Sequence, residues 1–300
     1  MPLKCPALRL RSGALSFEEP RIMGVVNVTP NSFSAGHTLD VDAAIAAGVA
    51  LRRAGAEILD IGGEATNPRA APVAEEEELA RVLPVVRGLA AAVDAWLSID
   101  TTKARVAAQA VAAGASLIND VSGGRFDPDM LDTAAELARA DGVGYIAGHL
   151  RGRSLAEVFA REPARPAAGA PAARAGDALT SAQVLTDLAD QVAAMPAALR
   201  ARCVVDPGLG FGKGDGPVNL ELLRSGDALF AATGRPVLMG PSRKRFLRRL
   251  LEPDASDASD AALDAATVGA CLTAVRGGAH LLRVHNVALL RPALTVYIRG

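Results

Sequence analysis

The feature that most constrains this 300-residue chain is a unit that recurs eight times. In each unit a short apolar run ends in a polar residue, a turn rich in Gly, Ser, Thr or Asn follows, and an Ala-rich stretch of helical character comes next. The runs end at or near Asn27, Asp60, Asp100, Asn119 with Asp120, His149, Asp206, Ser242, and Arg283 with His285. Strands that alternate with helices predict a parallel sheet covered by helices.

Eight strand–helix units favour a single α/β domain over residues 1–300, a (β/α)8 TIM barrel. A doubly wound open sheet is the alternative. In a barrel, the carboxyl ends of all strands converge on one face, whereas an open sheet needs polar strand ends only where its strand order reverses. Nearly every run here ends in a polar residue, so the barrel is preferred.

Three stretches are predicted to be helical, namely residues 41–54, 75–92 and 102–113. The second opens with Glu75–Glu78, and four acids at that place indicate a helix first turn rather than a disordered acidic patch. Thr101 is the expected N-cap of the third helix. Residues 161–178, rich in Pro, Ala, Gly and Arg, are expected to form a flexible surface insertion, and residues 253–260 another loop.

Composition excludes several classes of partner. The formal net charge is −1, so nothing favours bulk attraction to nucleic acid or to an anionic membrane. The chain has no apolar run long enough to span a bilayer and no signal-peptide pattern at its start, so a cytoplasmic protein is expected. Cys5, Cys203 and Cys271 are far apart, which predicts free thiols rather than disulfides or a zinc site.

The stretch VVDPGLGFGK, residues 204–213, superficially suggests a phosphate-binding loop. It is not a Walker A loop, because Pro207 replaces the first Gly and Gly214 replaces the hydroxyl residue. It is not a dinucleotide loop either, since Lys213 occupies the place of the last Gly. Two interpretations stay open: a simple glycine turn, or a turn whose glycines let a flat ligand approach the backbone beside Asp206.

Two groups of polar residues are candidates for a site at the strand ends. Ser242 and Lys244 follow the seventh run, and Arg283 and His285 alternate at the end of the eighth, so together they predict a cationic corner suited to a polyphosphate. Asn27 offers a neutral oxygen ligand for a hard cation. The plain alternatives are an ordinary βα loop around Asn27 and a solvated helix face for the arginines between 243 and 249.

The second group is Asp100, Asn119 and Asp206. Its members offer hydrogen-bond acceptors and an amide, but no nucleophile paired with a base. Such a set suits a heterocycle rich in N–H donors, such as a 2-amino-4-oxo pyrimidine ring, because a buried carboxylate accepts two parallel N–H bonds from it.

With these residues in view, the chain resembles the dihydropteroate synthase family. The resemblance rests on seven motifs in the family's order, from residue 22 to about residue 290: MGVVNVTPNSFS, EILDIGGEAT, LSIDTTKA, INDVSGG, VVDPGLGFGK, GPSRKRF and TVGACLTAVRGGAHLLRVHNV. The family fold is a TIM barrel. The resemblance implies that 6-hydroxymethyl-7,8-dihydropterin pyrophosphate loses pyrophosphate with the help of Mg²⁺, while 4-aminobenzoate attacks the methylene carbon to give 7,8-dihydropteroate. It also implies a homodimer and a dissociative reaction, in which stabilising the leaving group matters more than a general base.

The resemblance also assigns roles. Asp100, Asn119, Asp206 and Lys244 are expected to bind the pterin. Asn27, Arg283 and His285 are expected to hold the pyrophosphate, with Asn27 reaching Mg²⁺. The aminobenzoate is expected to lie among Thr66, Phe33, Pro68, Lys244 and Ser242. Of these, Asn27, Lys244, Arg283 and His285 are the predicted catalytic residues.

Several positions depart from the family pattern. Asn31 and Ala35 replace common acids in the first loop, Ala65 and Asn67 replace Ser and Arg in the second, and Asn286 replaces the Asp of RVHDV. Loss of an acid at 35 and a base at 67 removes a possible charge pair, although Arg69 is close enough in sequence to substitute. The leading hypothesis is an active synthase. One alternative is a pterin-binding paralogue with weak or altered activity. The other is a pterin-domain methyltransferase, and the intact Arg283 and His285 argue against it.

Overall fold

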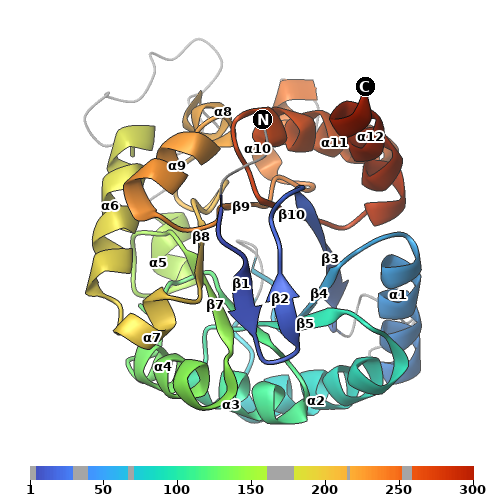
Figure 1. Cartoon of the computed structure of the whole chain (residues 1–300), viewed down its shortest axis with the longest axis vertical. Coiled ribbons are helices and arrows are strands. Elements are labelled where there is room, and N and C mark those ends of the chain that lie inside the picture. The colour runs from blue at the N-terminus through green and yellow to red at the C-terminus, as the bar shows by residue number, and fades with distance from the viewer. Residues whose placement is uncertain (1–4, 30–39, 67–70, 161–178, 215–216, 252–258) are drawn as a thin grey trace.

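The computed structural model describes residues 5–29, 40–66, 71–160, 179–214, 217–251 and 259–300. Its centre is a sheet of eight parallel strands in the order β8-β7-β6-β5-β4-β3-β10-β9. A parallel bridge between Val205 in β8 and Val237, just before β9, joins the two edges, so the sheet closes into a barrel (Figure 1). The strands are β3 (Arg21–Asn27), β4 (Ile58–Gly62), β5 (Trp96–Asp100), β6 (Leu117–Asp120), β7 (Gly144–Gly148), β8 (Cys203–Asp206), β9 (Leu238–Met239) and β10 (Leu281–Val284). The predicted TIM barrel and its eight strands are confirmed.

Helices surround the barrel (Figure 1). They are α1 (Val41–Arg53), α2 (Glu75–Ala92), α3 (Ala104–Ala113), α4 (Met130–Asp141), α5 (Leu155–Ala160), α6 (Ser181–Ala194), α7 (Ala197–Arg200), α8 (Pro217–Leu223), α9 (Gly226–Thr233), α10 (Arg245–Leu251), α11 (Asp260–Arg276) and α12 (Val287–Arg299). Because the strands are covered on both faces, they read as nearly continuous apolar runs. The core between strands and helices is built largely from Ala, Val, Leu and Ile, which matches the Ala-rich helical stretches of the sequence.

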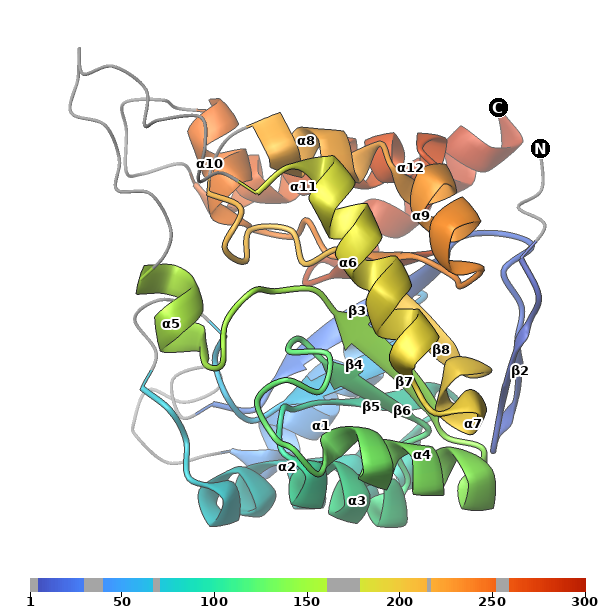
Figure 2. The ribbon, with the colours of Figure 1, turned by 90° about the vertical axis from the view of Figure 1, so that its left-hand side faces the viewer.

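An antiparallel hairpin that the sequence did not predict closes one end of the barrel. It consists of β1 (Leu8–Leu10) and β2 (Gly13–Leu15). Leu8, Leu15 and Phe17 are buried against side chains from the amino-terminal halves of the barrel strands. Figure 2 shows the hairpin at one end of the barrel and α5 at the other. The carboxyl ends of the strands, where polar residues gather, are therefore left for the functional site.

The predicted helices are present, with one correction. α2 begins at Glu75, as its acidic first turn predicted. α3 begins at Ala104 rather than at residue 102, and Thr101 is not its N-cap. The Ala104 N–H donates instead to Asp127 Oδ2 at 2.7 Å, so an acid 23 residues further along the chain supplies the acceptor.

Both predicted loops fall mainly outside the described residues. The segment 161–178 is outside them entirely, and so are residues 252–258. Ser259 caps α11, whose first residue is Asp260, so the second predicted loop ends earlier than residue 260.

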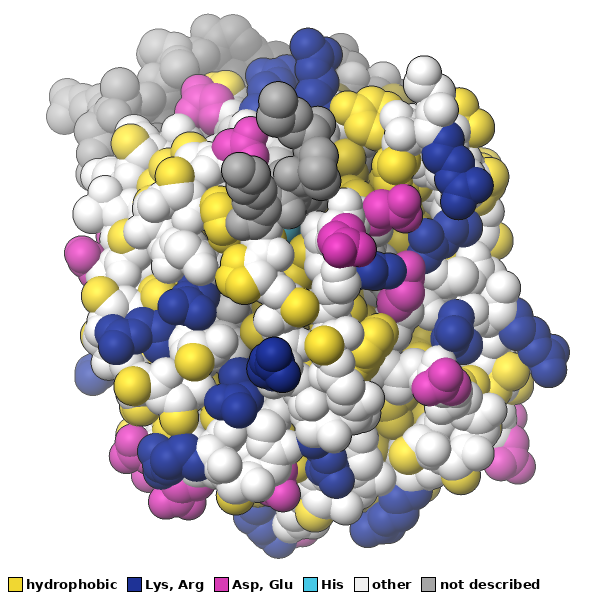
Figure 3. Space-filling view, in the orientation of Figure 1, with side chains coloured by type: hydrophobic (Ala, Val, Ile, Leu, Met, Phe, Trp, Pro, Cys, Tyr) yellow, Lys and Arg dark blue, Asp and Glu magenta, His cyan; other side chains and the backbone are white. Residues whose placement is uncertain are grey.

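The remaining expectations drawn from the composition concern the cysteines, membrane spans and surface charge. All three cysteines are free, as predicted. Within the described ranges, no helix combines the length and the apolar character needed to cross a bilayer. On the face that carries the hairpin, the described Lys and Arg side chains are interspersed with Asp and Glu (Figure 3).

Candidate active site

One pocket at the carboxyl ends of the strands collects six of the predicted site residues, namely Thr66, Asp100, Asn119, Asp206, Lys244 and Arg283. Val121, Leu209, Phe211 and Gly240 complete its wall. These residues come from most of the βα junctions of the barrel, so the closed sheet brings together side chains that are far apart in sequence. A pocket with apolar walls and a few convergent polar groups is typical of a small-molecule site.

Asp60 organises the acidic side of this pocket. It is fully buried, and its Oδ2 accepts from Asn119 Nδ2 at 2.9 Å and from Arg283 Nε at 2.6 Å. Arg283 Nη2 also donates to Asp100 Oδ2 at 2.6 Å. Sequence reasoning recorded Asp60 only as a strand position and missed this role. The available signal was a single carboxylate inside the otherwise apolar run ILDIG, which a buried strand tolerates only when the acid is paired.

Burial dominates the electrostatics of the pocket. Desolvation raises the pKa of Asp100 to about 7, against the lowering effect of Arg283. Burial also raises the pKa of Asp206, while the Gly208 N–H bond and the nearby lysines lower it. Burial lowers the pKa of Lys244 to about 8. A ligand whose N–H groups donate to these carboxylates would therefore stabilise their charged form, because the donors replace the water lost on burial.

The glycine-rich loop after β8 presents Asp206 to the pocket. Gly208, Gly210, Gly212 and Gly214 all have positive φ, between 58° and 78°. The Gly208 N–H donates to Asp206 Oδ1 and the Gly210 N–H to Asn219 Oδ1, each at 2.8 Å. Because the protein itself satisfies these two amides, the geometry favours a ligand-facing Asp206 over a phosphate cradle. Phe211, from the same loop, places its ring centroid 3.8 Å from Lys244 Nζ.

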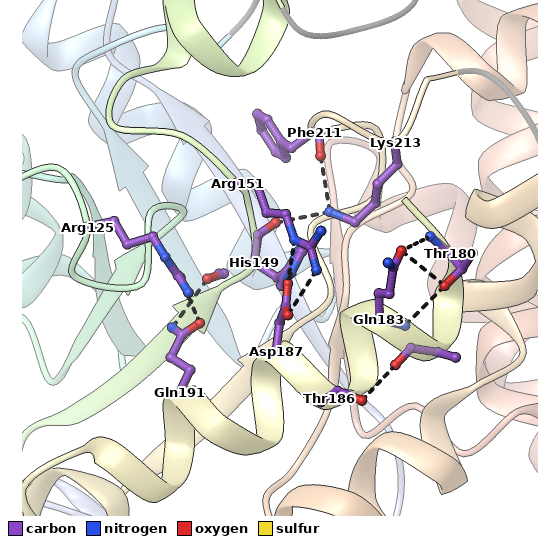
Figure 4. Close-up of polar contacts among 12 residues, drawn as sticks. Arg125, His149, Arg151, Thr180, Gln183, Thr186, Asp187, Gln191, Phe211 and Lys213 are labelled. Atoms are coloured by element: carbon purple, nitrogen blue, oxygen red, sulfur yellow. Dashed lines mark hydrogen bonds and ion pairs between the residues drawn. The ribbon is translucent and has the colours of Figure 1, made fainter. Parts of the chain in front are cut away.

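A polar network between this loop and α6 was also missed from the sequence (Figure 4). Lys213 is buried, and its Nζ donates to the His149 carbonyl at 3.0 Å and the Phe211 carbonyl at 3.1 Å. The His149 ring in turn bonds to Asp187 of α6 at 2.9 Å, and Asp187 also accepts from Arg151. Burial lowers the pKa of Lys213 to about 7. The network ties the ends of β7 and β8 together below the Asp206 turn.

Thr66 is placed by a second ionic cluster at the end of β4. Lys103 Nζ lies 2.5 Å from both Glu64 Oε2 and Glu78 Oε2. Glu78 is fully buried, so one ammonium is shared by two carboxylates in a partly dry site. The cluster fixes the chain two residues before Thr66.

The predicted cationic corner is divided in the structure. Arg283 turns toward the acidic side chains, whereas Asn27 and His285 line a neighbouring hollow together with Arg243 and Asn286. His285 Nδ1 and Ser242 Oγ share a hydrogen bond of 2.9 Å. Desolvation and the nearby cations, Arg283 first, lower the pKa of His285 to about 4. His285 is therefore neutral at pH 7, so its ring can offer a hydrogen bond, the contribution expected of it, but adds no positive charge.

For Arg243, the alternative of a solvated helix face does not hold. It precedes α10 and pairs with Asp264 of α11 at 2.8 Å. Phe33 and Pro68 lie outside the described residues, as do Asn31, Ala35 and Asn67, which depart from the family pattern, and Arg69, the possible substitute. The roles assigned to Phe33 and Pro68 thus stay predictions, and so do the individual roles of the residues that the structure places.

Comparison with known proteins decides the family. The family described as "Pterin binding enzyme" matches residues 23–285. The chain belongs to the pterin-binding enzyme family. A dihydropteroate synthase of Mycobacterium leprae is 41% identical to it over 293 residues, which cover 94% of each chain. These two matches confirm the resemblance to the dihydropteroate synthase family that the sequence motifs of this pterin-binding protein show.

Solved structures give the same family at the level of the fold. A Xanthomonas albilineans dihydropteroate synthase with 4-aminobenzoic acid has a TM-score of 0.82 and is 39% identical over 98% of both chains. The structure of a Xanthomonas albilineans dihydropteroate synthase with 7,8-dihydropteroate gives a TM-score of 0.79 at the same identity and coverage. The pterin-binding family fold therefore extends over nearly all of this chain.

Proposed function

We propose that this protein is an active dihydropteroate synthase. It joins 6-hydroxymethyl-7,8-dihydropterin pyrophosphate to 4-aminobenzoate and releases pyrophosphate, which makes it a transferase of folate synthesis. The observation that carries the proposal is the pocket in which Asp100, Asn119 and Asp206 face Lys244 and Arg283, in a chain whose relatives are named for this activity.

The acidic side of the pocket suits a pterin ring. Asp206 and Asp100 accept N–H bonds from the amino-pyrimidine edge, and Asn119 adds one donor and one acceptor. Phe211 and Val121 supply apolar wall. Asp60 keeps Asn119 oriented through its 2.9 Å bond, so ring recognition depends on a residue that does not itself line the pocket.

The reaction in this pocket needs no protein nucleophile. Among the described residues that line the pocket, Thr66 is the one with a hydroxyl side chain, and none is a Cys or a His. Catalysis then comes from holding the methylene carbon between the incoming amine and the leaving pyrophosphate, and from cations that stabilise the charge developing on the leaving group. Lys244 and Arg283 supply such cations inside the pocket, while Ser242, His285 and Asn27 supply hydrogen bonds beside it.

Mg²⁺ fits this site as an ion carried by the pyrophosphate. Within the described ranges, no three His, Cys, Asp or Glu side chains are grouped so as to hold a metal ion. Mg²⁺ often takes few protein ligands and completes its shell with water and phosphate oxygens. Asn27, exposed at the end of β3, would supply one such oxygen. When bound, the ion would neutralise charge on the leaving group.

The second substrate is assigned to the mouth of the same pocket. Thr66 and Lys244 line that pocket in the described part of the chain. Ser242, Phe33 and Pro68 are assigned to the same substrate by the family resemblance. A homodimer is part of the proposal. It is supported by apolar side chains exposed on α12, among them Val296 at 71% and Tyr297 at 43%, and light scattering of the purified protein tests it.

The decisive experiment measures pyrophosphate release from dihydropterin pyrophosphate and Mg²⁺, with and without 4-aminobenzoate. Release that depends on 4-aminobenzoate and yields dihydropteroate establishes the synthase, and shows that Ala35 and Asn67 are tolerated. Tight pterin binding without dependent release identifies the weak paralogue instead. In that case, Ala35→Asp with Asn67→Arg is the rescue to test.

A further inference from the structure

The turn between β9 and α10 has an unusual backbone at Arg243. Its φ is 55°, and among the described residues it is the one non-glycine with positive φ. L-residues adopt this region at a cost, so surrounding contacts must hold it. Ser242, on one side, bonds to His285, and Lys244, on the other, lies over Phe211. The conformation of Arg243 therefore sets where two predicted site residues point.

Two residues of α11 hold Arg243 in this conformation. Its Nε donates to Asp264 Oδ1 at 2.8 Å and its Nη2 to Asp264 Oδ2 at 3.1 Å. Its backbone N–H donates to Thr267 Oγ1 at 3.2 Å. Asp264 is 6% exposed, and a two-pronged bond between an arginine and a buried carboxylate fixes both partners in direction as well as distance.

Asn286 connects the same carboxylate to the next strand end. Its Nδ2 donates to Asp264 Oδ2 at 2.9 Å, and its Oδ1 accepts from the Leu289 N–H at 3.1 Å, which caps α12. Asn286 directly follows His285. One carboxylate thus links the turn that carries Ser242 and Lys244 to the strand end that carries His285.

We propose that Asp264 and Asn286 are positioning residues of the proposed synthase site. They act through Arg243 to hold Ser242, Lys244 and His285 in register with one another. The inference rests on the proposed function. In this chain the carboxylate that pairs with Arg243 comes from Asp264, and Asn286 supplies the amide that donates to it. A carboxylate at both positions would place two negative charges in hydrogen-bond contact.

The variant Asn286→Asp separates this inference from a plain capping role. Asp caps a helix as well as Asn does, and its charge is favourable at a helix amino terminus. If Asn286 only caps α12, the variant is neutral or more stable. If Asn286 positions Asp264, the variant loses a donor and gains a repulsive contact, so it is less stable and less active. The two interpretations predict opposite signs.

The pH dependence has a definite sign as well. The hydrogen bonds from Arg243 and Asn286 lower the pKa of Asp264. Among the described residues, His285 also acts on the Asp264 carboxylate and lowers its pKa, and Asp260 lies 3.7 Å from Arg243. In the Asn286→Asp variant, the new carboxyl group beside the ionised Asp264 would have a raised native pKa, so its cost appears as pH rises through that pKa. The melting deficit of Asn286→Asp should therefore be larger at pH 8 than at pH 5.

The experiment compares wild type, Asn286→Asp, Asp264→Asn and the double variant, in melting temperature from pH 5 to 8 and in synthase kinetics. At pH 8 each single variant should lower kcat/KM about 10-fold, the factor for one lost charge-assisted bond. The double variant should recover most of this loss and of the melting temperature. The amide introduced at position 264 can donate to the carboxylate introduced at position 286, and one negative charge remains. Asp260→Asn is the matched control, since Asp260 is largely exposed, and it should change kcat/KM less than twofold.

Two results would overturn the inference: losses that multiply in the double variant, or an Asn286→Asp protein as stable and active as wild type at pH 8. The melting temperatures of wild type, the two single variants and the double variant can be compared without any turnover. They therefore show whether Asp264 and Asn286 are coupled even if the wild type proves inactive. An active wild type whose variants show no coupling would remove this inference and leave the proposed function intact.

Discussion

Arg283 Nη2 lies 2.6 Å from Asp100 Oδ2, and the same guanidinium holds the buried Asp60 at 2.6 Å. The cation predicted to bind the leaving group therefore also pairs with the carboxylate predicted to bind the ring. The two halves of the pocket are electrostatically coupled, so a change at one should alter binding at the other. This coupling makes single-residue roles in the pocket measurable only with ligands that separate the ring from its pyrophosphate.

Arg283→Ala should weaken binding of dihydropterin pyrophosphate more than binding of a pterin that lacks pyrophosphate. It should also lower the free energy of unfolding by about 3–5 kcal/mol, because it leaves two buried carboxylates without their partner. Arg283→Lys keeps the charge but not the two-pronged geometry. Its ligand affinity and its free energy of unfolding should fall between those of wild type and those of Arg283→Ala. Calorimetric titration and urea denaturation measure these effects. Equal losses for both ligands would remove the assigned role.

Asp206→Ala should abolish measurable pterin binding, at a cost of about 2–3 kcal/mol or more for the lost charge-assisted bonds. Asp206→Asn is the matched variant, since its amide oxygen can still accept the Gly208 N–H that now bonds at 2.8 Å. It should fold normally while binding pterin more weakly than wild type. Titration with a non-reactive pterin measures both variants, and an affinity equal to that of wild type for Asp206→Ala would contradict the assignment.

Asp100 should give the protein a characteristic pH dependence. Its native pKa is about 7, above its ordinary value of 3.8. Its contribution to stability is therefore present at low pH and is lost as pH rises through about 7. Relative to wild type, Asp100→Asn should gain stability between pH 4 and pH 8. Denaturation at several pH values measures this gain, and a constant difference would show that the carboxyl group titrates normally.

The barrel and most of its pocket could be predicted from the sequence because strand ends carry local information. An apolar run that stops at or near a polar residue marks both a strand and the face to which its end contributes. β3, β5, β6 and β8 end on such a residue, and β7 and β10 end one residue before His149 and His285. The roles of Asp60, Lys213 and Asp264 could not be found this way. Each depends on a partner far along the chain, for example 223 residues for Asp60 with Arg283.

The hairpin of β1 and β2 was missed for a different reason. Each strand has only three residues, which is too short for an alternating pattern to stand out. Its burial comes from the open end of the barrel, which supplies apolar side chains such as Met23 and Ile58. Tertiary context, rather than local preference, therefore determines this element.

Gly208→Ala should damage the site far more than Gly234→Ala, although the two glycines have nearly the same φ, 67° and 65°. Both variants bear the cost of a left-handed L-residue, about 1–2 kcal/mol. A Cβ at Gly234 meets nothing within 4 Å, whereas a Cβ at Gly208 would lie 2.1 Å from the His149 carbonyl oxygen. Relief of that contact must move the turn that carries Asp206 and the carbonyl that Lys213 holds. Gly208→Ala should therefore lose additional stability and most pterin affinity, and Gly234→Ala should keep its affinity. Chemical denaturation and pterin titration compare the pair, and similar losses in both would show that the glycine is needed only for its backbone angle.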